Sequence, residues 1–262
     1  MSDLNRHKAI TDLLLDRPFI SVKELQDVTG VSAATVRRDI DKLDEAGVAR
    51  KVHGGIAAPD GFAATRRANA LPFVENRDIA VEAKRAIANK AATLVRDGSL
   101  IIIHGGSTCF HFGCEMANRN VRVFTNSMPV AAYISEHGTC QLTMGGGDLH
   151  REPGIVYDAG QGGYTFYASQ FFVGALGIER QGLMETNPLL VQLTRDMAAF
   201  ANEIIVLVDS RKFAERTSTL SLPFAQIRRL VTDDGLADAD ARMLEEEGVD
   251  YIVAARKGET EA

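Results

Sequence analysis

Residues 31–55 read VSAATVRRDIDKLDEAGVARKVHGG, and this stretch decides the fold of the N-terminal part of the chain. Val36, Ile40 and Leu43 recur at helical spacing and form one apolar face, while Ser32 is a residue type that caps helix starts. The pattern predicts a helix from Ser32 to Gly47. Its remaining surface carries small, polar or basic residues: Ala33, Ala34, Thr35, Arg37 and Arg38.

Two further helices are expected before this one. The first runs from about Asn5 to Asp16, where an Arg-Pro pair interrupts the apolar period. Ser21 and Glu24 have the spacing of a capping box and predict a second helix that ends at Thr29-Gly30. Three apolar residues of this second helix are expected to face inward: Val22, Leu25 and Val28.

Downstream of Gly47, residues 48–52 and Ile56 read as two short strands joined by the glycine turn His53-Gly54-Gly55. Three helices followed by such a hairpin predict a winged helix-turn-helix domain over residues 1–57. Its third helix is expected to enter the major groove of DNA and its wing to contact phosphates. The alternative is a small helical domain with a solvated basic face. The residues expected to bind DNA are Ser32, Ala33, Thr35, Arg37, Arg38, Arg50, Lys51 and His53.

The overall charge does not point to a nucleic-acid partner, because the formal net charge is −6. Residues 1–70 carry 11 Lys and Arg against 10 Asp and Glu, whereas residues 71–262 carry 18 against 25. DNA contact therefore has to come from the local basic cluster of Arg37, Arg38, Arg50, Lys51 and His53.

Residues 58–76 lack a sustained apolar period and are predicted to be a linker to a second domain at residues 77–262. There, apolar strands alternate with helical stretches, which predicts an open α/β sheet with helices on both faces. The expected strands are 100–103, 121–124, 141–144, 171–173, 204–208 and 229–232. The expected helices include Pro129–Glu136, Pro188–Ala201 and Ala237–Glu247.

Polar loops follow four of these strands, at the sheet edge where ligands of open α/β folds bind. After the first strand, glycines and hydroxyl side chains lead into a helix, which suits an anion such as phosphate. Each loop alone also reads as an ordinary turn, but together they predict a small, polar, anionic ligand. Glu185 is a further candidate. The residues expected to bind this ligand are His104, Gly105, Gly106, Ser107, Thr108, Thr125, Asn126, Gly145, Gly146, Asp209 and Lys212.

The motifs Ser21-Val-Lys-Glu-Leu, Val31-Ser-Ala-Ala-Thr-Val-Arg-Arg-Asp-Ile, Leu43-Asp-Glu-Ala-Gly and Val52-His-Gly-Gly resemble those of the DeoR family of sugar-catabolism regulators. The resemblance implies that Arg37 and Arg38 contact an operator. It also implies that the second domain is similar in fold to ribose-5-phosphate isomerase and binds phosphorylated sugars. His104 departs from the family, in which an acid usually stands at that position. Residues 106–116 resemble the ascorbate-utilisation repressors most, which implies ascorbate 6-phosphate as effector.

The sequence therefore predicts a transcriptional regulator, most readily a repressor, of a carbohydrate-catabolism operon, controlled by a phosphorylated sugar or sugar acid. It is expected to act as a homo-oligomer, a dimer or tetramer, on double-stranded operator DNA. The alternative is a sugar-phosphate isomerase with an appended helical domain, in which Asp209 or Glu185 acts as general base. We expect no enzyme activity, cofactor or metal site. Cytoplasmic location is expected, because no apolar run is long enough for a membrane span and residues 1–12 are too polar for a signal peptide.

Overall fold

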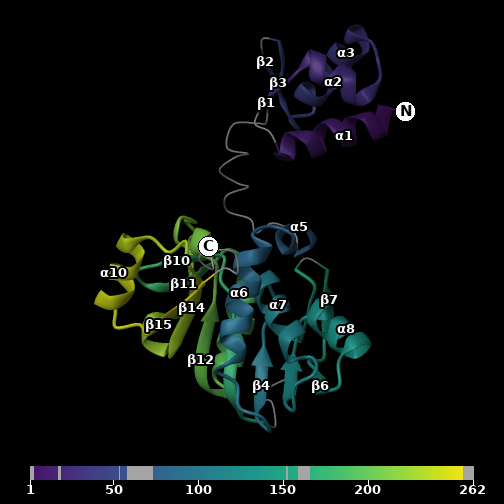
Figure 1. Ribbon diagram of the computed structural model, residues 1–262. Coiled ribbons are helices and arrows are strands. Elements are labelled where there is room, and N and C mark those ends of the chain that lie inside the picture. Colours follow the sequence, from purple (N-terminus) through teal and green to yellow (C-terminus); the bar gives the residue numbers. More distant parts are fainter. Residues whose placement is uncertain are drawn as a thin grey trace, which may run out of the picture. The chain divides into compact units, whose positions relative to one another are not determined.

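The computed structural model describes residues 3–16, 19–52, 54–57, 73–151, 153–158 and 166–255. The chain divides into two compact units, residues 1–67 and residues 68–262. Figure 1 gives the element labels used below.

The first unit contains helices α1 (Asp3–Asp16), α2 (Val22–Thr29) and α3 (Ala33–Glu45). Strands β1 (Phe19–Ser21), β2 (Arg50–Val52) and β3 (Gly55–Ala57) form an antiparallel sheet in the order β1-β3-β2. The helices and the β2–β3 hairpin have the winged helix-turn-helix arrangement that the sequence predicts. Strand β1 was not predicted, because its three residues directly precede the capping box and offer no alternation of their own.

Capping interactions at α2 and α3 have the predicted form. The Ser21 hydroxyl accepts the Glu24 N–H at 3.2 Å, and the Glu24 carboxylate accepts the Ser21 N–H at 3.0 Å. At the start of α3, the Ser32 hydroxyl accepts the Thr35 N–H at 3.3 Å. Gly30 closes α2 with φ of 70°, a conformation that glycine adopts without steric cost. The turn between α2 and α3 is therefore fixed by local chemistry.

An apolar core joins the three helices to the small sheet. Its buried members are Ile10, Leu14, Ile20, Leu25, Val36, Ile40, Leu43, Ala49 and Ile56. The prediction that Val28 faces inward is wrong, since its side chain is 56% exposed. Thr29 takes the inward position instead and donates its hydroxyl hydrogen to the Leu25 carbonyl. Because α2 is only two turns long, a shift of one residue moves a side chain from core to solvent.

The second unit is built on a seven-stranded sheet in which every pairing is parallel, in the order β15-β14-β12-β9-β4-β5-β6. Its strands are β4 (Leu100–Ile103), β5 (Arg122–Thr125), β6 (Gln141–Met144), β9 (Ala168–Val173), β12 (Ala201–Leu207), β14 (Arg229–Asp233) and β15 (Tyr251–Ala254). The α-helices of this unit are α5 (Phe73–Arg77), α6 (Val81–Ala92), α7 (Ser107–Met116), α8 (Met128–His137), α9 (Pro188–Ala198) and α10 (Asp238–Glu246).

Apolar clusters cover both faces of this sheet. Ile101 and Ile103 pack with α6, α7 and α8, whereas Ile102 between them packs on the opposite cluster with α9. The alternation of strand side chains thus produces three layers, and helices on both faces are confirmed. Figure 1 shows α6 and α7 in front of the strands.

A second, antiparallel sheet lies in the order β10-β11-β13, with β10 (Gly177–Glu179), β11 (Gly182–Glu185) and β13 (Thr219–Pro223). Strands β7 (Asp148–His150) and β8 (Ile155–Tyr157) pair as a hairpin, and two 3-10 turns follow β12 and β13, at Ser210–Phe213 and Phe224–Gln226. These short strands and β15 were not predicted. Runs of three or four residues carry little period, and they pair with segments far away in the sequence.

Two predicted boundaries are corrected by the structure. The helix expected to end at Ala201 ends at Ala198, and Ala201 begins β12. The last four residues of the expected linker 58–76 belong to α5, whose Phe73 ring contacts Phe110 edge-on at 5.5 Å. The rest of that linker lies outside the described residues.

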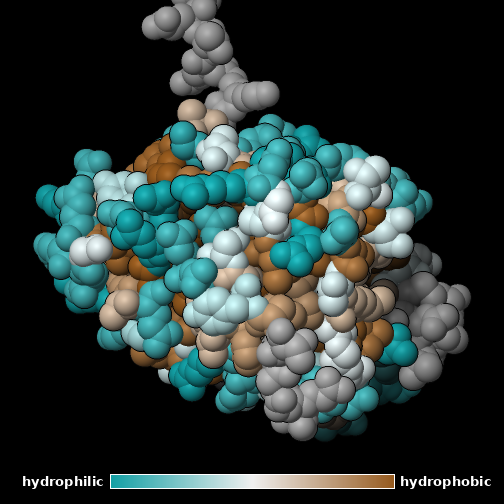
Figure 2. Space-filling view, turned by 90° about the horizontal axis from the view of Figure 1, so that it is seen from below, coloured by the Kyte–Doolittle hydropathy of each residue, from teal (hydrophilic) through white to brown (hydrophobic). Residues whose placement is uncertain are grey.

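Figure 2 shows the lower face with hydrophilic residues around most of its rim and hydrophobic residues toward its middle. None of the helices in the described ranges combines the length and apolar character that a membrane crossing needs.

Candidate functional site

The outer surface of α3 is a candidate nucleic-acid interface. Arg37 and Arg38 are both exposed, while Val36 and Ile40 of the same helix are buried. Of the small and polar residues expected beside them, Ser32 is exposed as the helix cap, and Ala33 and Thr35 are half-buried near the helix start. The helix thus presents two guanidinium groups from a rigid element, with little bulk at its N-terminal end.

Asp39, next to this arginine pair in the sequence, points the other way. Its side chain is 2% exposed, and it accepts hydrogen bonds from the Arg6 guanidinium at 2.9 and 3.2 Å. The His7 ring Nε2 lies 2.9 Å from the same carboxylate. Burial alone would raise the pKa of Asp39, but the hydrogen bonds from Arg6 and His7 hold it below its ordinary value. Asp39 therefore ties α1 to α3, a role the sequence analysis did not find.

The wing carries the other basic residues. Arg50 and Lys51 are exposed, and His53 lies outside the described residues. The Lys51 ammonium group contacts the Asp41 carboxylate at 2.6 Å, and the Lys51 backbone N–H donates to Asp44 at 2.8 Å. The first strand of the wing is thus attached to α3 at two points.

The second candidate site is a cavity at the carboxyl-terminal edge of the parallel sheet. It is lined by residues 104–108 after β4, by Lys212 after β12, and by Glu185 at the end of β11. These residues include six of the eleven predicted ligand contacts, together with the further candidate Glu185. The edge predicted from strand ends is therefore the edge that holds the cavity.

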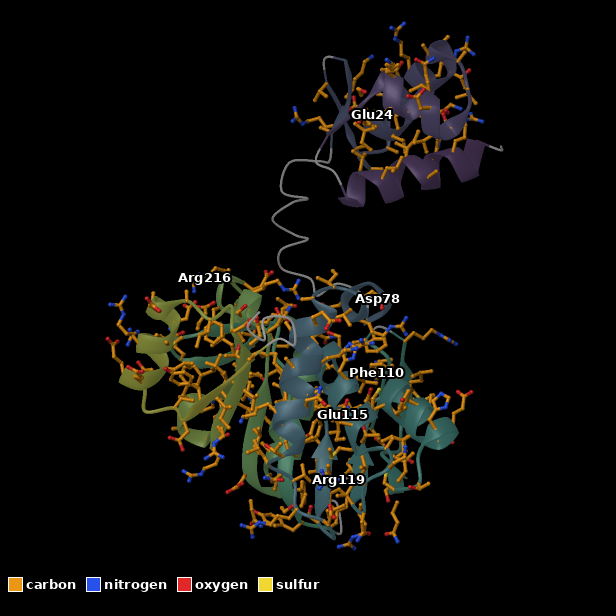
Figure 3. All side chains as sticks on the ribbon, in the orientation of Figure 1. Glu24, Asp78, Phe110, Glu115, Arg119 and Arg216 are labelled. Atoms are coloured by element: carbon orange, nitrogen blue, oxygen red, sulfur yellow. The ribbon has the colours of Figure 1, made fainter. Side chains whose placement is uncertain are left out.

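The start of α7 forms one wall of this cavity. Gly106 has φ of 115°, which favours glycine, and no side chain caps the helix there. The first N–H groups of a helix lack intrahelical partners and carry the positive end of the helix dipole. An anion placed at Ser107 and Thr108 would accept hydrogen bonds from this wall. Figure 3 shows α7 running from this end, with Phe110 near α5, toward Glu115 and Arg119 at the opposite end.

Lys212 and Glu185 bring opposite charges to the same cavity. Within the described ranges the Lys212 ammonium group has no hydrogen-bond partner. Burial lowers the pKa of Lys212, partly offset by Asp209, Glu215 and Glu185. Burial likewise raises the pKa of Glu185, partly offset by the N–H groups of Thr186 and Asn187. A partly desolvated cation without a partner is a strong attractor for an anionic ligand.

Five predicted contact residues are not among those that line the cavity: Thr125, Asn126, Gly145, Gly146 and Asp209. Thr125 is fully buried, donates its hydroxyl hydrogen to the Ile103 carbonyl at 2.6 Å, and accepts the Ser127 N–H at 3.1 Å. Asn126 is 1% exposed, and its side-chain amide has no partner among the described residues. Asp209 is 1% exposed and accepts two hydrogen bonds from Arg211, at 2.7 and 3.0 Å.

The β7–β8 hairpin explains why the loop after β5 stays outside the cavity wall. Val156 donates its N–H to the Asn126 carbonyl at 2.8 Å, and Ile155 bridges to Ser127. Ile155 itself lines the cavity beside Gly105. The hairpin therefore occupies the space that the sequence analysis left open between these loops.

Sequence reasoning missed several lining residues. Phe73 and Asn76 come from α5, Thr194 from α9, Ser221 from β13, and Pro153 and Ile155 from the β7–β8 hairpin. The pairing of Glu179 with Gly182 leaves Arg180-Gln181 as a two-residue loop, which lacks the Asn-Gly or Asp-Gly signal typical of such hairpins. No local pattern connects that hairpin to the sheet edge. Among the described residues, no cluster of three or more His, Cys, Asp or Glu side chains could hold a metal ion.

Comparison with protein families gives two matches. Residues 6–61 match the DeoR-like helix-turn-helix domain, and residues 79–234 match the DeoR C-terminal sensor domain. The first match contains α3 and its arginine pair. The second contains all cavity-lining residues except Phe73 and Asn76.

Among curated proteins, the HTH-type transcriptional regulator UlaR of Shigella dysenteriae serotype 1 is 30% identical over 96% of this chain and 99% of its own length. UlaR of Escherichia coli strain K12 / DH10B matches to the same extent. Among solved structures, ribose 5-phosphate isomerase A from Methanocaldococcus jannaschii is 22% identical, with a TM-score of 0.37 over 51% of this chain and 54% of that one. The beta subunit of eIF2B from Chaetomium thermophilum is 12% identical, with a TM-score of 0.39 over 57% and 48%.

Proposed function

Because the chain belongs to the DeoR family of helix-turn-helix transcriptional regulators, we propose that it represses a carbohydrate-catabolism operon and is controlled by a phosphorylated sugar or sugar acid. It does so in the cytoplasm, where operator DNA is found. One observation carries the effector part of the proposal: the start of α7 and the ammonium group of Lys212 line the same cavity, and neither has a side-chain partner among the described residues.

The effector's phosphate would lie at the α7 wall, with Gly105, Gly106, Ser107 and Thr108 supplying backbone and hydroxyl donors. Lys212 would neutralise part of its charge. His104 and Glu185 would contact the rest of the effector. Direct contact from Thr125, Asn126, Gly145, Gly146 and Asp209 stays a prediction that this cavity does not support.

For operator DNA, α3 would enter the major groove, where Arg37 and Arg38 contact guanine edges or phosphates. Ser32, Ala33 and Thr35 would allow close approach at the helix start. Arg50, Lys51 and His53 of the wing would contact the flanking backbone. Two copies of the unit are needed for two half-sites, so the protein would act as a dimer or tetramer.

An isomerase with an appended helical domain is the rival interpretation, and the charge pairing at Asp209 argues against it. A general base must be within reach of the substrate. Asp209 is buried, paired with Arg211, and outside the cavity wall, which leaves only Glu185 of the two bases considered. We therefore propose no catalytic role, and expect no isomerisation when the purified protein is incubated with pentose and hexose phosphates.

The DNA part is tested with Arg37→Ala in a gel-shift titration on the promoter fragment that flanks the protein's own gene. Loss of a guanine or phosphate contact is expected to weaken binding about tenfold or more. Arg122→Ala, at an exposed arginine of the second unit, is the matched control and should bind normally. Unchanged affinity of Arg37→Ala would remove the assignment of α3 as the recognition helix.

The effector part is tested by a thermal-shift screen with pentose, hexose and sugar-acid phosphates. A compound that binds the folded state raises the unfolding temperature by mass action. Lys212→Gln should abolish the shift of every hit while leaving DNA binding unchanged. A set of hits that shift wild type and Lys212→Gln equally would place the effector elsewhere.

A further inference from the structure

His104 is held in one orientation at the back of the cavity. Its backbone N–H donates to the Phe172 carbonyl at 2.9 Å, and its ring packs edge-on against Phe171 with centroids 5.9 Å apart. The residue is 5% exposed and lines the cavity. Its ring therefore has little freedom to turn.

The hydrogen bonds of His104 define its tautomer. Ring Nδ1 lies 3.1 Å from the Gly105 carbonyl oxygen, and a carbonyl oxygen only accepts, so Nδ1 carries the hydrogen. Burial lowers the pKa of His104 to about 4, which keeps the ring neutral at physiological pH. A neutral ring with its hydrogen on Nδ1 presents Nε2 as a hydrogen-bond acceptor.

One hydroxyl group lies next to this acceptor, and a second belongs to the same cavity wall. The Thr194 hydroxyl oxygen is 3.4 Å from Nε2, which is long for an O–H···N hydrogen bond. The Ser221 hydroxyl is buried in the same wall and has no partner among the described residues. The cavity thus offers uncharged hydrogen-bonding side chains in addition to the start of α7 and Lys212.

We propose that His104 determines effector specificity by accepting a hydrogen bond from a hydroxyl group on the sugar carbons, through Nε2, while the phosphate is held at α7 and Lys212. Thr194 and Ser221 complete this hydroxyl-binding wall. The inference rests on the proposed function and adds that the hydroxyl groups of the effector, not only its phosphate, are recognised. It selects polyhydroxy phosphates over analogues that lack the contacted hydroxyl.

The test compares wild type with His104→Phe and His104→Gln by titration calorimetry. The probes are inorganic phosphate and a panel of pentose and hexose phosphates, each with analogues that lack one hydroxyl. Wild type should prefer one parent compound over one of its deoxy analogues by about tenfold, since a site built for a hydroxyl rejects its absence. His104→Phe should lose that preference, while His104→Gln, which keeps an acceptor, should retain part of it.

Inorganic phosphate separates this inference from the proposal on which it rests. His104→Phe should bind phosphate within about twofold of wild type, because the α7 wall is unchanged. If His104→Phe keeps the full preference, or wild type shows none, the role of His104 is overturned and the effector site stands. If wild type binds no sugar phosphate, the proposed effector class fails and this inference fails with it.

A second, independent observation concerns α5. Phe73 and Asn76 line the cavity, and α5 is the first described element after residues 58–72, which connect it to the N-terminal unit. Figure 1 shows α5 at one end of the second unit, beside the start of α7. An effector in the cavity would therefore touch the segment that leads directly to the DNA-binding unit.

Three contacts hold α5 in place. The Phe73 ring packs edge-on against Phe110, and the Lys84 ammonium group donates to the Asn76 carbonyl and, at 3.3 Å, to the Asn76 side chain. Because α5 has only five residues, its position depends on such contacts with α6 and α7 more than on its own backbone hydrogen bonds.

We infer that α5 couples the cavity to DNA binding: an effector that contacts Phe73 and Asn76 changes the position of α5 and thereby the geometry available to the DNA-binding units. The inference rests on the proposed function. A ligand changes the position of a helix only through contacts that differ between its two positions, and these two side chains supply them.

The test uses Phe110→Ala, which removes the ring that Phe73 packs on without altering a cavity-lining residue. The probe is the compound of the sugar-phosphate panel with the largest thermal shift. Operator affinity is measured by fluorescence anisotropy with and without that compound. The ratio of the two Kd values should fall at least fivefold in Phe110→Ala, while affinities for DNA alone and for the compound alone stay within about threefold.

Tyr133→Ala is the matched control, because Tyr133 on α8 also packs edge-on against Phe110, at 5.8 Å. It should leave the ratio unchanged. Lys84→Met, which releases Asn76, is a second test variant should Phe110→Ala fold poorly, and it should lower the ratio as well. If the folded test variants have the same ratio of Kd values as wild type, the role of α5 is overturned. If the compound leaves the operator Kd of wild type unchanged, the proposed function is overturned instead.

Discussion

Asp39 ties α3, the proposed recognition helix, to α1. Its buried carboxylate accepts hydrogen bonds from Arg6 and contacts His7, both on α1. Asp39→Asn keeps the shape of the side chain but removes the buried negative charge that the largely buried Arg6 guanidinium contacts. We expect the free energy of unfolding of the N-terminal unit to fall by about 2 to 4 kcal/mol. Chemical denaturation monitored by circular dichroism measures it.

The sign of the pH dependence follows from the lowered pKa of Asp39. A group whose pKa is lower in the folded state stabilises the fold above its unfolded pKa, and the stabilisation is lost as pH falls through the folded pKa. The difference in unfolding free energy between wild type and Asp39→Asn should therefore shrink on acidification. Asp41→Asn, at an exposed carboxylate two residues away, should show no comparable loss. Equal stability of the two variants at neutral pH would contradict this account.

Lys84 in the second unit gives a pH dependence of the same sign as Asp39, but in the alkaline range. It is fully buried on α6, and burial lowers its pKa to about 8, helped by Arg211 and Lys212 and opposed by Asp209 and Asp78. Between about pH 8 and 10.5 the unfolded chain holds the lysine proton more tightly than the folded one does. The free energy of unfolding of wild type, minus that of Lys84→Met, should therefore increase through that range by up to about 3 kcal/mol. Denaturation at pH 7, 8, 9 and 10 measures this, and a flat difference would contradict it.

At the residue scale, the sequence could predict hydrogen bonds between near neighbours, but not contacts with residues that are distant in the sequence. Ser21, Glu24, Ser32 and Gly30 were predictable because caps and turns depend on neighbours within four residues. Asp39 and Lys84 were not, since their partners are 33 and 8 residues away. Asp209 was expected at the ligand because it follows a strand, yet it pairs with Arg211 two residues on.

At the element scale, the wing is attached to α3 by an ion pair that uses one of the basic residues expected at DNA. Lys51 contacts Asp41 at 2.6 Å, and both side chains are about half exposed. Asp41→Asn removes a negative charge from the DNA-facing side and frees Lys51 for phosphate. Operator affinity should rise severalfold at low salt, and the slope of log affinity against log salt should steepen by about one.

Salt titrations by anisotropy measure that slope. Lys51→Gln is the paired variant: it should weaken binding and make the slope shallower by a similar amount if Lys51 reaches phosphate at all. An unchanged slope in both variants would mean that Lys51 serves only to attach the wing to α3. Stability should change little in either case, since exposed ion pairs are screened by water.

The elements that the sequence predicted share a property that the missed ones lack. Strands β4 and β12 are apolar runs buried on both faces, and α3 has a clear apolar stripe, so burial imposes a readable pattern. Strands β1, β8 and β10 have three residues each and are defined by the strand they pair with. Strand β8 contacts the loop after β5, and without β8 nothing in the sequence indicated that Thr125 and Asn126 lie outside the cavity lining.

At the scale of the whole molecule, the described residues form a core in each unit, and none of them belongs to the core of both. The N-terminal core contains nine buried side chains, all from residues 10–56, while the two clusters of the second unit cover opposite faces of its sheet. A core of that size supports a free energy of unfolding of only a few kcal/mol, whereas the larger unit buries far more apolar surface. We expect the units to unfold in separate steps, the smaller one first.

Differential scanning calorimetry should therefore show two transitions, and each should respond to its own ligand. A sugar phosphate that binds the cavity should raise the later transition and leave the earlier one nearly unmoved, because it contacts only the second unit. An operator duplex should raise the earlier transition. Asp39→Asn should lower the earlier transition alone, and Lys212→Gln should cancel the sugar-phosphate shift alone. A single transition that both ligands raise together would mean that the two cores fold as one cooperative block, and a stability change in one unit would then reach the other without α5.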